Sequence, residues 1–79
     1  MRLDKYLKVS RLIKRRTVAN EACDNASISV NGRPAKASYD VKVGDKIEIS
    51  MGGRTVAVEV LQVAESVRKD DAAAMYKEL

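Results

Sequence analysis

Three consecutive cations, Lys14, Arg15 and Arg16, stand where the second of two predicted helices begins. The free N–H groups of a helix N-terminus form the positive end of its dipole, which disfavours bases there by ~0.3–1 kcal/mol each. A phosphate reverses this balance, because it accepts hydrogen bonds from the N–H groups and from arginine guanidinium groups. The position of these cations therefore indicates anion binding.

Lys5, Lys8 and Arg11 extend the positive charge along the preceding predicted helix. Residues 1–16 hold seven of the 15 Lys and Arg residues but one, Asp4, of the 11 Asp and Glu residues. The rest of the chain is slightly acidic, so the net charge of +4 comes from one end. A solvated helix face is the alternative interpretation, but so dense a cluster favours a polyanion, above all nucleic acid.

Catalysis and metal binding are nearly excluded by composition. The chain has no histidine and one cysteine, so an imidazole-based catalytic pair, a disulfide and a zinc site all lack their residues. Cys23 falls on the apolar side of the second predicted helix and is expected to be buried and unreactive. We therefore expect no enzyme activity, no cofactor and no metal.

The sequence also lacks signals for export or membrane insertion. No segment approaches the ~20 apolar residues that span a bilayer. The basic N-terminus is not followed by the apolar run of a signal peptide. The protein is expected in the cytoplasm, with no membrane partner.

Apolar spacing predicts helices at residues 3–13 and 16–24. The predicted inward stripe of the first helix consists of Leu3, Tyr6, Leu7, Ser10 and Ile13. Asp4 is predicted on the opposite, polar side. Asn25 is expected to end the second helix in a left-handed conformation.

From Ser27 onward the period changes to two, which predicts short strands. Asn31-Gly32 and Gly52-Gly53 predict two-residue hairpin turns. Pro34 limits the segment after the first turn to a sheet edge, with a short return strand expected at residues 35–37. The loss of alternation after Val60 indicates a bulge or the end of pairing.

The C-terminal segment has helical spacing. Ala72, Met75, Tyr76 and Leu79 predict an amphipathic helix of about two to three turns within residues 66–79. The order of elements predicts an α+β fold, with two packed N-terminal helices on a small antiparallel sheet and a short C-terminal helix. A boundary is expected near residue 64, between a domain of residues 1–64 and a helical tail of residues 65–79.

Four segments, in this order and spacing, resemble the S4 RNA-binding domain, which is named after ribosomal protein S4. They read RLDKYL, SRLIKRRTVANEAC, ISVNG and VKVGDKIEI, within about residues 1–50. The resemblance implies that the sheet is bent and that RNA binds on the helical pair. The hairpin MGGRTVAVEVLQV and the tail RKDDAAAMYKEL are similar to small stand-alone bacterial members. These include the heat-shock S4 protein and the RqcP group, which MRLDKYLKVSRLIKRRT resembles more closely.

The RqcP group implies a ribosome-associated quality-control factor. Such a factor binds rRNA and tRNA on large ribosomal subunits obstructed by peptidyl-tRNA, and it helps an RqcH-type partner to add C-terminal alanine tails. The expected partners are large-subunit rRNA, the large ribosomal subunit, peptidyl-tRNA and an RqcH-type tailing factor, bound by a monomer. Charge and resemblance together predict these RNA-binding residues: Arg2, Asp4, Lys5, Lys8, Arg11, Lys14, Arg15, Arg16 and Lys36.

Two further features of the sequence lie outside that set. Tyr39, beside Lys36 and Lys42, is a weaker candidate for stacking on a base. Many family members carry glycine where this chain has Asn25 and Ala26, so the corner after the second helix is expected to differ.

Other functions stay open. The chain could be an RNA-binding module that acts with an rRNA- or tRNA-modifying enzyme, or an adaptor for an acidic protein partner. Nuclease treatment separates these classes, because an adaptor keeps its partner and an RNA binder loses it. DNA binding is disfavoured, since outward residues such as Glu21 and Asp24 suit a phosphate-lined groove poorly.

Overall fold

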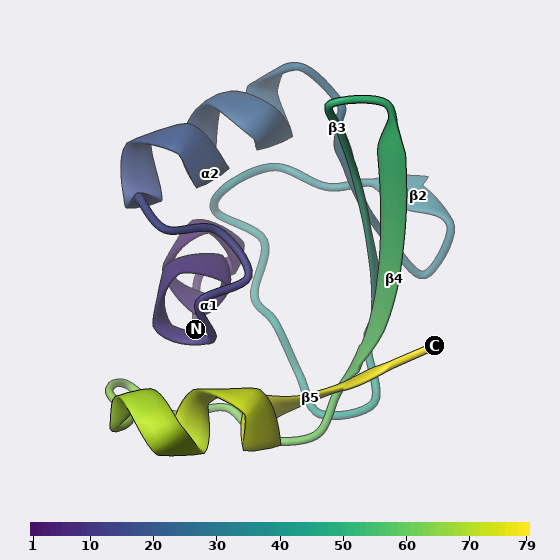
Figure 1. Ribbon diagram of the computed structural model, residues 1–79. Coiled ribbons are helices and arrows are strands. Elements are labelled where there is room, and N and C mark those ends of the chain that lie inside the picture. The colour runs from purple at the N-terminus through teal and green to yellow at the C-terminus, as the bar shows by residue number, and fades with distance from the viewer.

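The computed structural model describes residues 1–79, in which the helices cover one face of a single sheet (Figure 1). Its helices are α1 (Leu3–Val9), α2 (Arg16–Asp24) and the 3-10 helix η1 (Lys69–Met75). Its strands are β1 (Ile28–Val30), β2 (Arg33–Pro34), β3 (Lys46–Met51), β4 (Arg54–Val60) and β5 (Tyr76–Glu78). The strand order is β2-β1-β3-β4-β5, and every neighbouring pair is antiparallel. The predicted α+β class is confirmed. None of the helices is long and apolar enough to cross a membrane.

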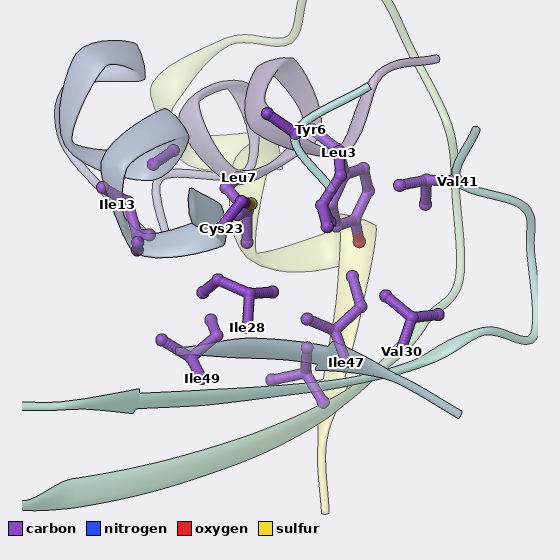
Figure 2. Close-up of a cluster of buried hydrophobic side chains, with 14 of the residues drawn as sticks. Leu3, Tyr6, Leu7, Ile13, Cys23, Ile28, Val30, Val41, Ile47 and Ile49 are labelled. Carbon is purple, nitrogen blue, oxygen red and sulfur yellow. The ribbon is translucent and has the colours of Figure 1, made fainter. Parts of the chain in front are cut away.

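The hydrophobic core lies between the two N-terminal helices and the sheet. Figure 2 shows Leu3, Tyr6 and Leu7 of α1 facing Ile28 and Ile47 on the strands, and all five side chains are fully buried. Burying each such aliphatic side chain contributes roughly 1.5–3 kcal/mol. The whole predicted stripe of the first helix is buried: Leu3, Tyr6, Leu7, Ser10 and Ile13.

Helix α2 begins and ends at the predicted residues, whereas α1 is shorter than predicted and ends at Val9. Arg11 stops α1 with a left-handed backbone, at φ 64°. Its N–H donates to the Lys8 carbonyl at 3.1 Å. Ile13 still reaches the core, because its N–H donates back to the Leu7 carbonyl at 3.1 Å and draws the turn inward.

The corner after α2 corrects the expectation for Asn25. Asn25 has φ −87°, and the left-handed residue is Ala26, at φ 58°. The Ala26 N–H donates to the Cys23 carbonyl at 3.1 Å, and the Ser27 N–H to the Ala22 carbonyl at 2.9 Å. This pair of bonds is a Schellman motif, in which the left-handed position is usually glycine.

Ala26→Gly is therefore expected to stabilise the protein. A left-handed alanine costs roughly 1–2 kcal/mol, and the greater freedom of glycine in the unfolded chain offsets part of that. A net gain of up to about 1 kcal/mol in unfolding free energy is expected, measured from the urea midpoint. The control is Ala73→Gly in η1, which should lower stability. A lower midpoint for Ala26→Gly would contradict strain at this corner.

Both predicted hairpin turns are confirmed. Asn31 and Gly32 have φ 53° and 83°, and Gly52 and Gly53 have φ 59° and 78°. Positive φ at both central residues is the type I′ geometry that matches the twist of paired strands. The prediction of a return strand at residues 35–37 is wrong. A two-residue turn places the returning strand, β2, immediately after Gly32.

The C-terminal segment differs most from expectation. The helix predicted within residues 66–79 is present only as η1, over Lys69–Met75, because Tyr76–Glu78 forms β5 and pairs with β4. Ala72 and Met75 are buried as predicted, whereas Leu79 is exposed. The hydroxyl of Tyr6 donates to the Met75 carbonyl at 2.8 Å, which joins this segment to α1. The division of the chain near residue 64 stays a prediction.

Candidate nucleic-acid interface

Asp4 was predicted on the polar side of α1, but its side chain is only 3% exposed. Its carboxylate accepts hydrogen bonds from Nε of Arg2 at 3.1 Å and from Nε of Arg16 at 3.2 Å. The side-chain amide of Asn20 at 3.4 Å and the backbone N–H of Lys5 at 2.8 Å complete its partners. We call Asp4, Arg2, Arg16 and Asn20 the Asp4 cluster. It joins the residue before α1 to the first turns of α2.

The charge state of Asp4 follows from these contacts. Burial alone raises the pKa of its carboxyl, but the hydrogen bonds from Arg2, Arg16, Asn20 and the Lys5 N–H outweigh burial and hold the pKa below its ordinary value of 3.8. The carboxylate is therefore ionised at neutral pH. It offsets the repulsion between two guanidinium groups that it holds side by side.

The two arginines remain available to a ligand. Their side chains are 51% exposed for Arg2 and 47% exposed for Arg16. Arg16 uses only Nε in the Asp4 cluster, so both of its Nη groups are free to donate. A guanidinium group fixed at one edge loses less conformational freedom when it binds a phosphate at the other.

The N-terminus of α2 has the predicted arrangement. Arg15 is the N-cap residue and Arg16 the first residue of the helix, no side chain caps the N–H groups, and the first turn has no acidic residue. Lys14 and Arg15 are exposed and form no ion pair. Because the helix supplies no anion of its own, its N-terminus can accept one from a ligand.

The remaining predicted residues lie at two places around α1. Lys8, Arg11 and Lys14 line a hollow at the C-terminal end of α1, which the segment around Glu65 and Lys69 closes on the other side. Lys5 forms an ion pair with Glu65, so it is the only lysine of the predicted set with an acidic partner.

Lys36 lies at the opposite end of α1. It belongs to the loop after β2, whose carbonyl groups accept hydrogen bonds from the first residues of α1. The Leu3 N–H donates to the Tyr39 carbonyl at 2.8 Å, and the Asp4 N–H to the Ala37 carbonyl at 3.2 Å. The loop that carries Lys36 is therefore anchored to the N-terminal end of α1.

The structure thus gathers the predicted cations around the helical pair. We call this surface the cationic face; it comprises Arg2, Lys5, Lys8, Arg11, Lys14, Arg15, Arg16 and Lys36. Asp4 lies beneath it and positions two of its members. Sequence reasoning missed Asn20 and Glu65 as partners of this surface. For Asn20 the available signal was its position four residues after Arg16, on the same side of α2.

The outer face of the sheet has a different charge pattern. Lys46, Glu59 and Lys77 are paired in register across β3, β4 and β5. Glu48 lies on the same face one pair further along, beside Ala57. These side chains bring two charges of each sign, so the outer face has no net charge from them.

Cys23 has the predicted structural role. Its side chain is buried against the core. Burial, together with the negative charges of Asp4 and Asp24, raises the pKa of its thiol to about 11. The thiol is therefore protonated, and a poor nucleophile, at neutral pH.

A comparison with protein families shows the family of this chain. The family model of the S4 domain matches residues 1–47, more than half of the chain. The chain belongs to the S4 domain family. All nine residues predicted to bind RNA lie within the matched part of this S4-domain protein, and the predicted resemblance is confirmed.

Relatives of this S4-domain protein cover nearly its whole length. The RQC P-site tRNA stabilizing factor of Streptococcus pneumoniae is 57% identical over 98% of this chain and 88% of its own length. The factor of that name from Bacillus subtilis is 54% identical over 96% of this chain and 88% of its own length. Among solved structures, the trimeric heat shock protein 15 of Vibrio cholerae has a TM-score of 0.93 and 28% identity, over 100% of this chain and 81% of the other.

Arg11 offers a test within the S4 domain in which stability and binding change in opposite directions. Arg11→Gly removes a positive charge, and it also removes the side chain from a residue with a left-handed backbone. The unfolding free energy is expected to rise by about 1 kcal/mol. RNA affinity is expected to fall, and the slope of log affinity against log salt to become shallower by about 0.7–0.9. Arg11→Ala is the matched control, with the same loss of charge and no gain in stability. Unchanged RNA affinity in both variants would remove Arg11 from the interface.

Proposed function

We propose that this protein is a non-catalytic RNA-binding factor of ribosome quality control, acting in the cytoplasm on obstructed large ribosomal subunits. The observation that carries the proposal is the pair of guanidinium groups, from Arg2 and Arg16, that buried Asp4 holds side by side on the cationic face. Phosphate groups are the ligands that such fixed guanidinium groups match in charge and geometry.

Recognition by this face depends on shape and phosphate positions. Paired RNA has a deep, narrow major groove, and side chains cannot reach the base edges within it. A protein therefore binds paired RNA through the sugar-phosphate backbone of the RNA. With about five phosphates engaged, log affinity should fall with log salt at a slope of roughly −3 to −5. The outer face of the sheet, without net charge, would face away from the RNA.

The choice of RNA rests on the relatives. Two of them, at 57% and 54% identity, are RQC P-site tRNA stabilizing factors. We infer that this protein likewise contacts tRNA together with large-subunit rRNA, and that it supports C-terminal alanine tailing by an RqcH-type partner. An S4-domain chain that bridges these two RNAs would hold peptidyl-tRNA in place while the tailing factor works.

Sedimentation tests this proposal. A tagged protein is followed through sucrose gradients of lysates containing obstructed large subunits, and the co-purified RNA is identified. It should sediment with large subunits, carry peptidyl-tRNA and leave these fractions after nuclease treatment. Comigration with small subunits alone would contradict the proposed role. A protein partner that is retained after nuclease treatment would favour the adaptor alternative.

The oligomeric state is part of the same proposal. We propose that the protein acts as a monomer, as expected from its sequence, although heat shock protein 15 of Vibrio cholerae is trimeric in its structure. Light scattering of the purified protein gives the molar mass, and a value near three times 8.7 kDa would contradict the monomer.

A further inference from the structure

A hollow opens between β2 and the loop that follows it. Its lining includes the apolar groups of Val30, Pro34, Ala35 and Tyr39 and the cationic groups of Arg33 and Lys36. Of the four hollows on the surface, it alone is lined by an aromatic side chain, and it alone has no carboxylate in its lining. We call it the Tyr39 hollow. An apolar surface beside unopposed positive charge suits a flat ring joined to an anion.

The side chain of Tyr39 is fixed in this hollow. Its hydroxyl donates to Oδ2 of Asp45 at 2.9 Å, while the side-chain amide of Asn31 donates to Oδ1 at 3.1 Å. The Asn31 side-chain oxygen in turn accepts the Lys46 N–H at 3.0 Å. Because the polar ends of Tyr39 and Asn31 are occupied, the hollow offers a ring for stacking more readily than donors or acceptors for reading a base edge. Stacking on a held aromatic ring tolerates any base.

The cationic groups beside the ring are free. Arg33 and Lys36 are exposed and form no ion pair. The loop that carries Lys36 and Tyr39 is hydrogen-bonded to the start of α1, through the Leu3 N–H and the Tyr39 carbonyl. The loop that lines the hollow is therefore anchored to the start of α1, next to Arg2. An RNA strand whose phosphates contact Arg2 and Lys36 can extend directly over the hollow.

We propose that the Tyr39 hollow binds one unstacked nucleobase of an RNA strand, with the base against Tyr39 and Pro34 and the flanking phosphates on Arg33 and Lys36. This inference rests on the proposed function in taking RNA as the ligand. It adds a bulged or flipped nucleotide to the phosphate and shape recognition described above. Base–aromatic contacts of this kind change affinity by roughly 5- to 100-fold, without strong preference for one base.

The test compares two RNA hairpins that differ by one bulged nucleotide. The purified full chain should bind the bulged hairpin roughly 5- to 100-fold more tightly than the fully paired one. Tyr39→Leu should abolish this preference, and Tyr39→Phe, which keeps the ring and loses the bond to Asp45, should retain most of it. Equal affinity of the parent for both hairpins, or a preference that survives Tyr39→Leu, overturns the inference.

Two further measurements keep the result decisive. If Tyr39→Leu fails to fold, Pro34→Ala at the exposed edge strand replaces it as the variant that should lose the preference for the bulged hairpin. In a separate measurement, 4-thiouridine at the bulge should crosslink to the peptide that contains Tyr39. A crosslink elsewhere counts against the hollow. Arg16→Ala should weaken both hairpins equally. If Arg16→Ala weakens both hairpins equally but the Tyr39 variants bind like the parent, only this inference fails. If Arg16→Ala does not weaken binding, the proposed function fails.

Discussion

Arg16→Ala is expected to weaken binding to large ribosomal subunits by about 10- to 100-fold, as is normal for the loss of a charge-assisted hydrogen bond. Arg2→Ala should have a similar effect, because the two guanidinium groups share Asp4 and lie side by side. Each single variant leaves Asp4 with one arginine, so the fold should be retained. Binding is measured by sedimentation at several salt concentrations, and each variant should make the slope of log affinity shallower by about 0.7–0.9.

Two controls separate fixed geometry from charge. Lys77→Ala removes the same charge from the outer face of the sheet, and it should leave the affinity almost unchanged. Arg16→Lys keeps the charge but loses the bond from Nε to Asp4 and the planar donor group. It should bind with an affinity between those of the parent and Arg16→Ala, at the salt slope of the parent. If Arg16→Ala and Lys77→Ala weakened binding equally, net charge alone would explain the affinity and the site assignment would be wrong.

Asp4→Asn is the second change with a large expected effect, and the direction of its effect on RNA affinity is informative. The substitution removes a negative charge, so net charge alone predicts tighter RNA binding. If Asp4 positions Arg2 and Arg16, binding should instead weaken, by about tenfold or more, because two phosphate contacts lose their alignment. The unfolding free energy should fall by about 1–3 kcal/mol, since charge-assisted hydrogen bonds to a buried carboxylate are replaced by weaker bonds to an amide.

The dependence of this loss on pH follows from the lowered pKa of Asp4. A carboxyl whose pKa is lower in the folded state contributes stability above its unfolded pKa, and it loses that contribution as the pH falls through the folded value. The stability gap between the parent and Asp4→Asn should therefore be full above about pH 4. It should shrink as the pH falls below the ordinary value of 3.8. Urea denaturation at a series of pH values measures the gap. A gap that persists unchanged at the lowest pH would show that ionisation of Asp4 is not its source.

Local signals predicted much of this fold. Apolar spacing and small inward residues fixed the bounds of α2, and two pairs of turn residues fixed the hairpins, because a type I′ turn needs residues that tolerate positive φ. The cationic face could be predicted for the same reason. Its members, except Lys36, lie within the first 16 residues, where five of them recur every third residue from Arg2 to Lys14.

Two of the errors involve partners that are distant in the sequence. Tyr76 and Leu79 have helical spacing with Met75, yet the open edge of β4 supplies strand pairing, and the chain follows the tertiary partner. Asp4 lies on the polar side of α1 by its spacing, but Arg16 and Asn20 come from α2 and cover it. Spacing within one helix cannot reveal a group that another helix supplies.

The unequal charge of the two faces also acts before contact. A molecule with cations around its helices and balanced charges on its outer sheet face has an electric dipole moment, so the field of a polyanion rotates it as well as attracting it. Encounters with RNA should then begin with the helical side already turned toward the ribosome, which raises the fraction of collisions that lead to binding. Added salt would slow association by weakening this torque, even before any phosphate contact is made.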